Sequence, residues 1–79
     1  MTREDVISVV AEALVEDASV ITSDTSTETH PAWDSFAQVD ILQGLDVASG
    51  DQTARIDELV AATSVRQILE VLAKHGIIE

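Results

Sequence analysis

Apolar residues recur at three- and four-residue intervals in several stretches of this chain, which is the spacing of one face of an α-helix. Near the N-terminus, Val6, Val10 and Leu14 form such a stripe behind Thr2, a candidate N-cap. This pattern predicts a first helix over about residues 3–16.

Three further helices follow from the same pattern and from the residues at their ends. The second is predicted to begin at Asp34 or Ser35 and to run to about residue 48, and a short third covers about 54–61, with Asp51 or Thr53 as its cap. The last begins at Ser64, where the S-x-x-Q spacing predicts a capping box. It ends at a Gly-Ile pair typical of a Schellman motif.

The segment between the first two helices is long, polar and rich in serine and threonine ("DASVITSDTSTETHPAW"). Val20 and Ile21 are the residues expected to anchor it to the core, and His30 before Pro31 is expected to be extended. No stretch shows the alternation of a β-strand. The predicted fold is therefore all-α: a small four-helix bundle of three longer helices and one short one, with a long first loop, forming one domain over residues 1–79.

At about 100° per residue, the second helix divides into two faces. The side predicted to face the core carries Ala37, Ile41, Leu42, Leu45 and Ala48. The opposite side carries Phe36, Val39, Asp40, Gln43, Asp46 and Val47. Because a purely solvated face would not contain one Phe and two Val, this mixture predicts a docking surface for a protein partner. The alternative is that Phe36 folds back onto the loop beside Trp33.

The charge of the chain narrows the classes of partner. Four Lys or Arg against fifteen Asp or Glu give a net charge of −11, and residues 1–46 alone hold ten acids and one base. Such a surface repels a phosphate backbone and an anionic membrane, so neither nucleic acid nor lipid is an expected partner. Basic patches on other proteins would be attracted. The simpler alternative is that the acidity only keeps a small protein soluble.

The absence of cysteine excludes a disulfide framework and a thiolate metal site. No run approaches the roughly 20 apolar residues of a membrane span, and the acidic N-terminus does not resemble a signal peptide. The expectation is a soluble, cytoplasmic protein. A monomer is also expected, because no heptad seam is evident.

Ser35 lies in the first turn of the predicted second helix, directly after Asp34, the candidate cap. The simple interpretation is that this serine is only tolerated at a helix start. A phosphate ester on its hydroxyl would, however, face the free N–H groups of the first turn. Catalysis is not expected, because His30 and His75 are the only histidines and no oxyanion hole is recognisable. No metal site is expected either, since "DTSTETHPAWD" lacks the glycine and the final glutamate of a calcium loop.

The order of elements and motifs resembles an acyl carrier protein of the discrete kind. An acidic amphipathic helix and a long loop are followed by "WDSFAQVDILQGLD", a short helix and "TSVRQILEVL", so that the resemblance covers about residues 3–74. The resemblance implies that Ser35 carries a 4′-phosphopantetheine arm, attached from coenzyme A by a phosphopantetheinyl transferase. The thiol of the arm would hold an acyl or aminoacyl group as a thioester.

The resemblance also implies partners. In that family the helix after the serine is recognised by basic patches on the loading and synthase enzymes. Asp34, Asp40 and Asp46 would be the charged contacts, and Phe36 and Val39 the apolar ones. The protein would then be a shuttle for fatty acyl, polyketide, aminoacyl or D-alanyl groups, without catalysis of its own.

The sequence departs from the family pattern at three places. Phe36 stands where leucine is usual, and "VASGDQTARI" is less acidic than the usual continuation. Ala62 replaces a large aliphatic residue, which affects the groove expected between the second and third helices. The alternative function is an acidic helical adaptor, in which the face of Phe36, Val39, Asp40 and Val47 binds a basic partner and Ser35 only starts a helix.

Overall fold

The structure is a computed structural model that describes residues 1–78. This part of the chain is mostly helical and contains no β-strand, only an isolated bridge between Ser26 and Ser64. The elements are α1 (Arg3–Leu14), a short 3₁₀ turn η1 (Ala18–Val20), α2 (Ser35–Ala48), α3 (Asp57–Val60) and α4 (Val65–Lys74). The predicted small helical bundle is confirmed.

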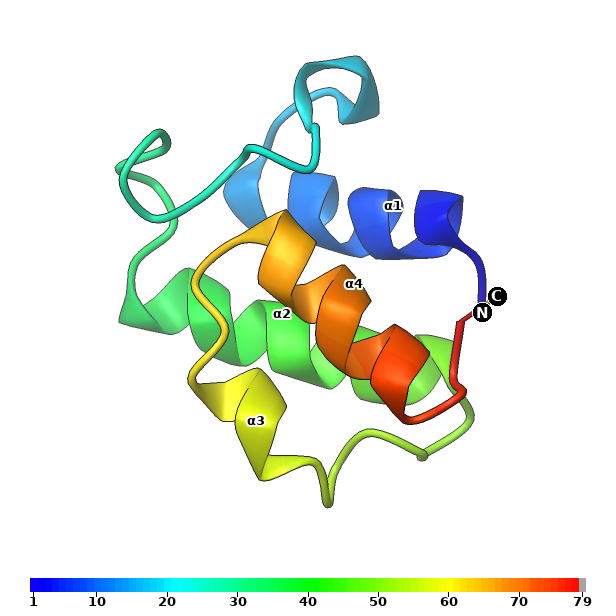
Figure 1. Ribbon diagram of the computed structural model, residues 1–79. Coiled ribbons are helices and arrows are strands. Elements are labelled where there is room, and N and C mark those ends of the chain that lie inside the picture. The colour runs from blue at the N-terminus through cyan, green and yellow to red at the C-terminus, as the bar shows by residue number, and fades with distance from the viewer. Residues whose placement is uncertain (79) are drawn as a thin grey trace.

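The three longer helices, α1, α2 and α4, enclose the core, and the short α3 covers one side of it. α1 packs against α2 and α4, and α3 packs against both α2 and α4 (Figure 1). The helical stripes supply the side chains with the least exposure, namely Val6, Val10, Ile41, Leu45, Leu59, Val65, Ile68 and Leu72. Each such burial stabilises the fold by about 1.5–3 kcal/mol. The two ends of the described part of the chain lie close together, with the amino group of Met1 3.5 Å from the carbonyl oxygen of Ile77.

The first helix begins with a complete capping box. The Oγ1 of Thr2 accepts from the amide of Asp5 at 3.2 Å, and the amide of Thr2 donates to Oδ2 of Asp5 at 2.9 Å. The hydrogen bond from the Thr2 amide holds the pKa of the Asp5 carboxyl below its ordinary value, because it stabilises the charged form. The predicted start of α1 is therefore confirmed.

The box predicted at the start of α4 is only half formed. Ser64 Oγ accepts from the amide of Gln67 at 3.1 Å. The side chain of Gln67 does not return to Ser64, however, because its Oε1 accepts from the amide of Thr63 at 2.8 Å. The cap thus reaches one residue further back than the S-x-x-Q pattern predicts.

Two helix ends are Schellman motifs, and one of them shortens α1. At the end of α4, Gly76 has φ +71°, and the amide of Ile77 donates to the carbonyl of Leu72 at 2.9 Å, as predicted. α1 ends at Leu14 instead of residue 16, because Val15 adopts the left-handed conformation (φ 57°). Valine rarely adopts this conformation because its branched side chain is strained there. The sequence therefore gives no signal that a helix ends at Val15.

The third helix is shorter than predicted, and neither predicted residue caps it. α3 begins at Asp57 after Ile56, which makes no capping hydrogen bond with its side chain. Thr53 and Ala54 are held in the preceding loop, because Oδ1 of Asp46 accepts from the Thr53 hydroxyl at 3.3 Å and from the Ala54 amide at 3.1 Å. The amide of Ile56 donates to the carbonyl of Thr53 at 3.0 Å, so residues 53–56 form a separate turn ahead of α3.

Two side chains expected in the core lie at the surface. Ala48 is exposed because it is the last residue of α2 and lines a surface groove between α1 and α2. Val20 is 48% exposed at the end of η1, so the prediction that it anchors the first loop is wrong. The other predicted anchor, Ile21, is buried.

Backbone hydrogen bonds attach the first loop to the start of α4. The amide of Val65 donates to the carbonyl of Thr25 at 2.9 Å, and the amide of Arg66 donates to the carbonyl of Ser23 at 3.1 Å. These loop carbonyls satisfy two of the amides that a helix start leaves without partners.

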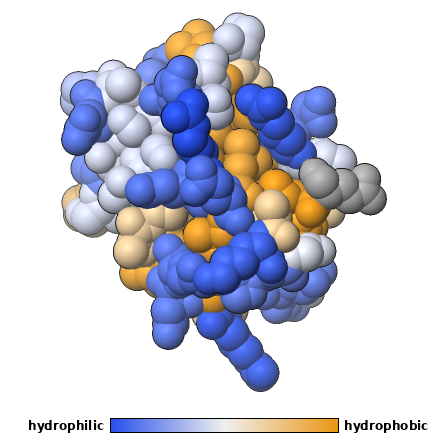
Figure 2. Space-filling view, viewed as in Figure 1, coloured by the Kyte–Doolittle hydropathy of each residue, from blue (hydrophilic) through white to orange (hydrophobic). Residues whose placement is uncertain are grey.

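In the same view as Figure 1, hydrophilic residues cover much of the surface and hydrophobic ones show between them (Figure 2). Within residues 1–78, no helix is both long and apolar enough to span a bilayer.

Candidate functional site

The hydroxyl of Ser35 is presented at the first residue of α2. Ser35 is exposed, and the residue before it is the N-cap of the helix. The Oδ1 of Asp34 accepts from the amide of Ala37 at 3.0 Å, and its carbonyl accepts from the amide of Gln38 at 2.9 Å. The predicted cap is thus confirmed, and it fixes the backbone on both sides of Ser35.

Two backbone amides next to this hydroxyl are unused. Within residues 1–78, the amides of Ser35 and Phe36 donate to no protein acceptor, as is usual in the first turn of a helix. Together with the positive end of the helix dipole they favour an anion. The Asp34 carboxylate opposes an anion at the same place. The position is therefore accessible to a phosphate ester without being a dedicated phosphate cradle.

A hydrogen-bonded connection beneath Ser35 joins α2 to the end of α3. The indole nitrogen of the buried Trp33 donates to Oε1 of Gln38 at 2.6 Å. The amide nitrogen of Gln38 donates to the carbonyl of Ala62 at 2.9 Å, with the carbonyls of Leu59 and Val60 each at 3.3 Å. Sequence reasoning missed Gln38, because no local spacing rule pairs a tryptophan with a glutamine five residues later.

The outer face of α2 is exposed as the helical wheel predicts. Phe36 is 81% exposed and Val47 79% exposed, with Val39, Asp40 and Gln43 also exposed between them. The alternative position for Phe36, folded onto the loop beside Trp33, is wrong. The exposed face of α2 therefore combines apolar side chains with an acid, which is the composition expected of a docking surface.

Asp46 differs from the other acids predicted to contact a partner. It is only half-buried, but its Oδ1 already accepts two hydrogen bonds from the loop before α3. Its structural role is therefore to hold that loop. A contact between Asp46 and a partner stays a prediction.

Both histidines are hydrogen-bonded away from Ser35. Nδ1 of His30 lies 3.0 Å from Oγ1 of Thr29, and Nε2 of His75 lies 3.1 Å from Oε1 of Glu58. The hydrogen bond from His75, together with the one from Lys74, holds the pKa of Glu58 below its ordinary value. Among residues 1–78, no three His, Asp or Glu side chains form a cluster that suits a metal ion.

Comparison of the chain with protein-family models, with curated proteins and with solved structures finds no match. A function is therefore inferred from the residues of the chain and from the geometry of the α2 start.

Proposed function

We propose that this protein is a phosphopantetheine-dependent carrier of the acyl carrier protein type. A 4′-phosphopantetheine arm on Ser35 would hold acyl or aminoacyl groups as thioesters and deliver them to biosynthetic enzymes in the cytoplasm. The observation that carries the proposal is the exposed hydroxyl of Ser35 at the first residue of α2, within the motif "WDSF".

The attachment step needs only what Ser35 offers and what a transferase supplies. The Ser35 oxygen would attack the phosphorus that bears the pantetheine part of coenzyme A. The phosphoanhydride bond would break, adenosine 3′,5′-bisphosphate would leave, and the hydroxyl proton would pass to a base on the transferase. The new phosphodiester would begin beside the unused amides of Ser35 and Phe36, which favour its negative charge.

The surface next to Ser35 supports recognition by basic enzymes. Phe36 and Val39 are exposed apolar residues, and Asp40 is an exposed acid one residue after Val39. The net charge of −11 would steer basic patches of a phosphopantetheinyl transferase and of loading and synthase enzymes toward this face. Phe36 in place of the usual leucine would select partners with room for a larger ring.

Intact-mass analysis tests the proposal. The protein is incubated with coenzyme A and a broad-specificity phosphopantetheinyl transferase, and we expect a gain of one phosphopantetheinyl group. Ser35→Ala should abolish the gain, whereas Ser8→Ala, which removes an exposed serine of α1, should not. Circular dichroism of each variant confirms that the protein is folded.

The alternative function is an acidic adaptor, and the mixed apolar and acidic face of α2 is the observation that favours it. The two functions share this face and differ only in whether the hydroxyl of Ser35 is modified. No mass gain in a folded sample would contradict the carrier function. The adaptor function would then be the one to pursue, with basic proteins as the candidate partners.

A further inference from the structure

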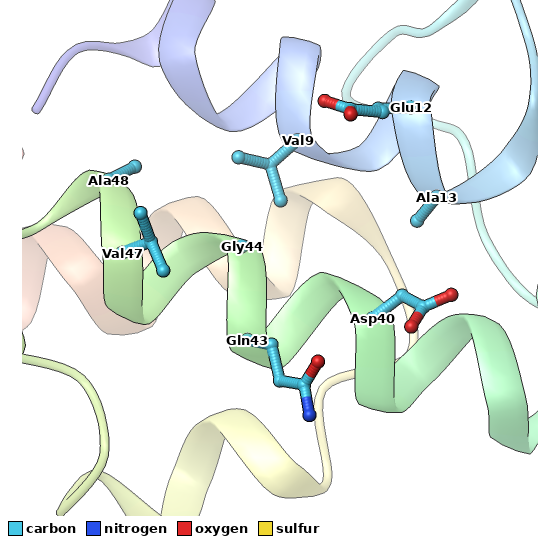
Figure 3. A pocket seen from close by; sticks show the side chains of 8 residues that line it. All are labelled: Val9, Glu12, Ala13, Asp40, Gln43, Gly44, Val47 and Ala48. Atoms are coloured by element: carbon cyan, nitrogen blue, oxygen red, sulfur yellow. The ribbon is translucent and has the colours of Figure 1, made fainter.

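A surface groove with a volume of about 550 Å³ runs along the contact between α1 and α2. Its apolar lining consists of Val9, Ala13, Gly44, Val47 and Ala48, and its polar lining of Glu12, Asp40 and Gln43. Figure 3 shows Val9 pointing from α1 toward Gly44, while Gln43 points away from α1. The helices approach closely here, because a Cβ on Gly44 would lie 2.7 Å from Cγ1 of Val9.

The groove carries negative charge and no positive charge. Glu12 lies on α1 and Asp40 on α2, and both carboxylates are exposed. None of the four Lys or Arg residues lines the groove. The ion pairs among residues 1–78 involve Asp24 and Glu58 only, so neither groove acid is neutralised within the described chain.

We propose that this groove, which shares Asp40 and Val47 with the exposed face of α2 and adds Val9 and Glu12 of α1, is a docking site for a basic amphipathic helix of a partner protein. An aliphatic side chain of that helix would pack between Val9 and Val47, and flanking Lys or Arg side chains would pair with Glu12 and Asp40. The occupant is inferred from charge complementarity, since an apolar floor between two unpaired acids favours an aliphatic residue beside a cation.

The site is separate from the proposed attachment serine. Nine residues separate Ser35 from Gly44, and at about 100° per residue this places them on opposite sides of α2. They also lie about 13 Å apart along the helix axis, at about 1.5 Å per residue. A partner in the groove would leave the hydroxyl of Ser35 uncovered, but it would compete with any other partner that needs Asp40, because Asp40 lines the groove and also belongs to the exposed face of α2.

The test is an NMR titration of the ¹⁵N-labelled protein with a helical peptide of leucine and lysine. Gly44 is a useful reporter because the chain has only three glycines. We expect saturable shifts at Val9, Ala13, Gly44 and Val47. The titration is repeated on Ser35→Ala, which should bind equally well, so the result does not depend on the proposed carrier function.

Matched variants separate groove binding from general attraction to an acidic protein. Glu12→Gln with Asp40→Asn should weaken binding about threefold to tenfold, the effect of losing two exposed ion pairs. Glu28→Gln with Asp57→Asn removes the same charge elsewhere on the exposed surface and should change the affinity less than twofold.

A second matched pair tests the apolar contact. Val47→Ser should weaken binding, whereas Val60→Ser should not, although both valines are largely exposed. Three results would overturn the proposal: no saturable shift at Gly44, shifts centred on Phe36 or on α3, or equal losses in the groove variants and their controls.

Discussion

One side-chain amide, that of Gln38, joins three parts of the molecule. It accepts from the buried indole of Trp33 on the loop before α2, and it donates to backbone carbonyls at the end of α3 and directly after it. Because Ser35 lies between Trp33 and Gln38, this residue positions the proposed attachment site without itself being a site for chemistry. Removing it would leave an indole N–H and a carbonyl unpaired below the surface.

Gln38→Ala should therefore lower the free energy of unfolding by about 1–3 kcal/mol. Gln43→Ala is the control, since Gln43 is exposed on the same helix and makes no hydrogen bond with its side chain within residues 1–78. It should change the stability by less than about 0.5 kcal/mol. Urea unfolding followed through the fluorescence of Trp33, the single tryptophan, measures both. Equal stability of the two variants would show that Gln38 is not structural.

The packing of α1 on α2 depends on the lack of a side chain at Gly44. Alanine is the better helix former by about 1 kcal/mol, so propensity alone predicts that Gly44→Ala stabilises the protein. The Cβ would, however, lie 2.7 Å from the Val9 side chain, well inside van der Waals contact. Overpacking of this kind costs about 1–3 kcal/mol.

We therefore expect Gly44→Ala to lower the melting temperature in the presence of Val9 and to raise it in a Val9→Ala background. Thermal melts of the four proteins of this double-mutant cycle give the coupling between the two positions. Additive effects would mean that α1 moves aside without cost, and that the close approach does not fix the position of the two helices.

α3 is a short helix, and Glu58 connects it to the end of α4 through Lys74 and His75. These contacts lower the pKa of Glu58 from an ordinary value of 4.5. A carboxylate with a lowered pKa stabilises the folded state above its unfolded pKa, and this contribution is lost as the pH falls through the folded pKa.

Glu58→Gln should therefore have a lower melting temperature than the parent protein at pH 6, by a few degrees at most because the pair is exposed. The difference should shrink as the pH falls below about 4.5. Melts from pH 6 to pH 3 measure it, with Glu70→Gln of α4 as the control for loss of one exposed charge. A difference that stays constant over this range would contradict the role of the ionised carboxylate.

The limits of α2 were predictable from the sequence and those of α3 were not, for a physical reason. Asp34 starts α2 through local hydrogen bonds from the amides of Ala37 and Gln38, which short-range rules describe. The segment before α3 is held instead by Asp46, whose carboxylate reaches across the loop to residues 53 and 54, and α3 itself begins without a side-chain cap. The helical wheel likewise predicted which way the α2 side chains point. It could not predict that α1 leaves Ala48 uncovered, because that depends on how the two helices pack.

For the whole molecule, electrostatic self-repulsion opposes folding. A net charge of −11 is spread over a body with a radius of gyration of 11.0 Å. The Debye length is about 30 Å at 0.01 M salt and about 10 Å at 0.1 M. At low ionic strength each carboxylate therefore interacts with most of the others, whereas at physiological salt only near neighbours interact. The compact state suffers more from this repulsion than the expanded unfolded chain.

We therefore expect NaCl to raise the melting temperature by about 5 °C between about 0.01 M and 0.5 M, which is roughly 1 kcal/mol for a domain of this size. Mg²⁺ at matched ionic strength should raise it at least as much, because a divalent ion accumulates more strongly around dense carboxylates. The double variant Glu28→Gln with Asp57→Asn, with two fewer negative charges, should respond less to either salt. A melting temperature that neither salt changes would show that the carboxylates of the folded protein are far enough apart for their repulsion to have no effect on stability.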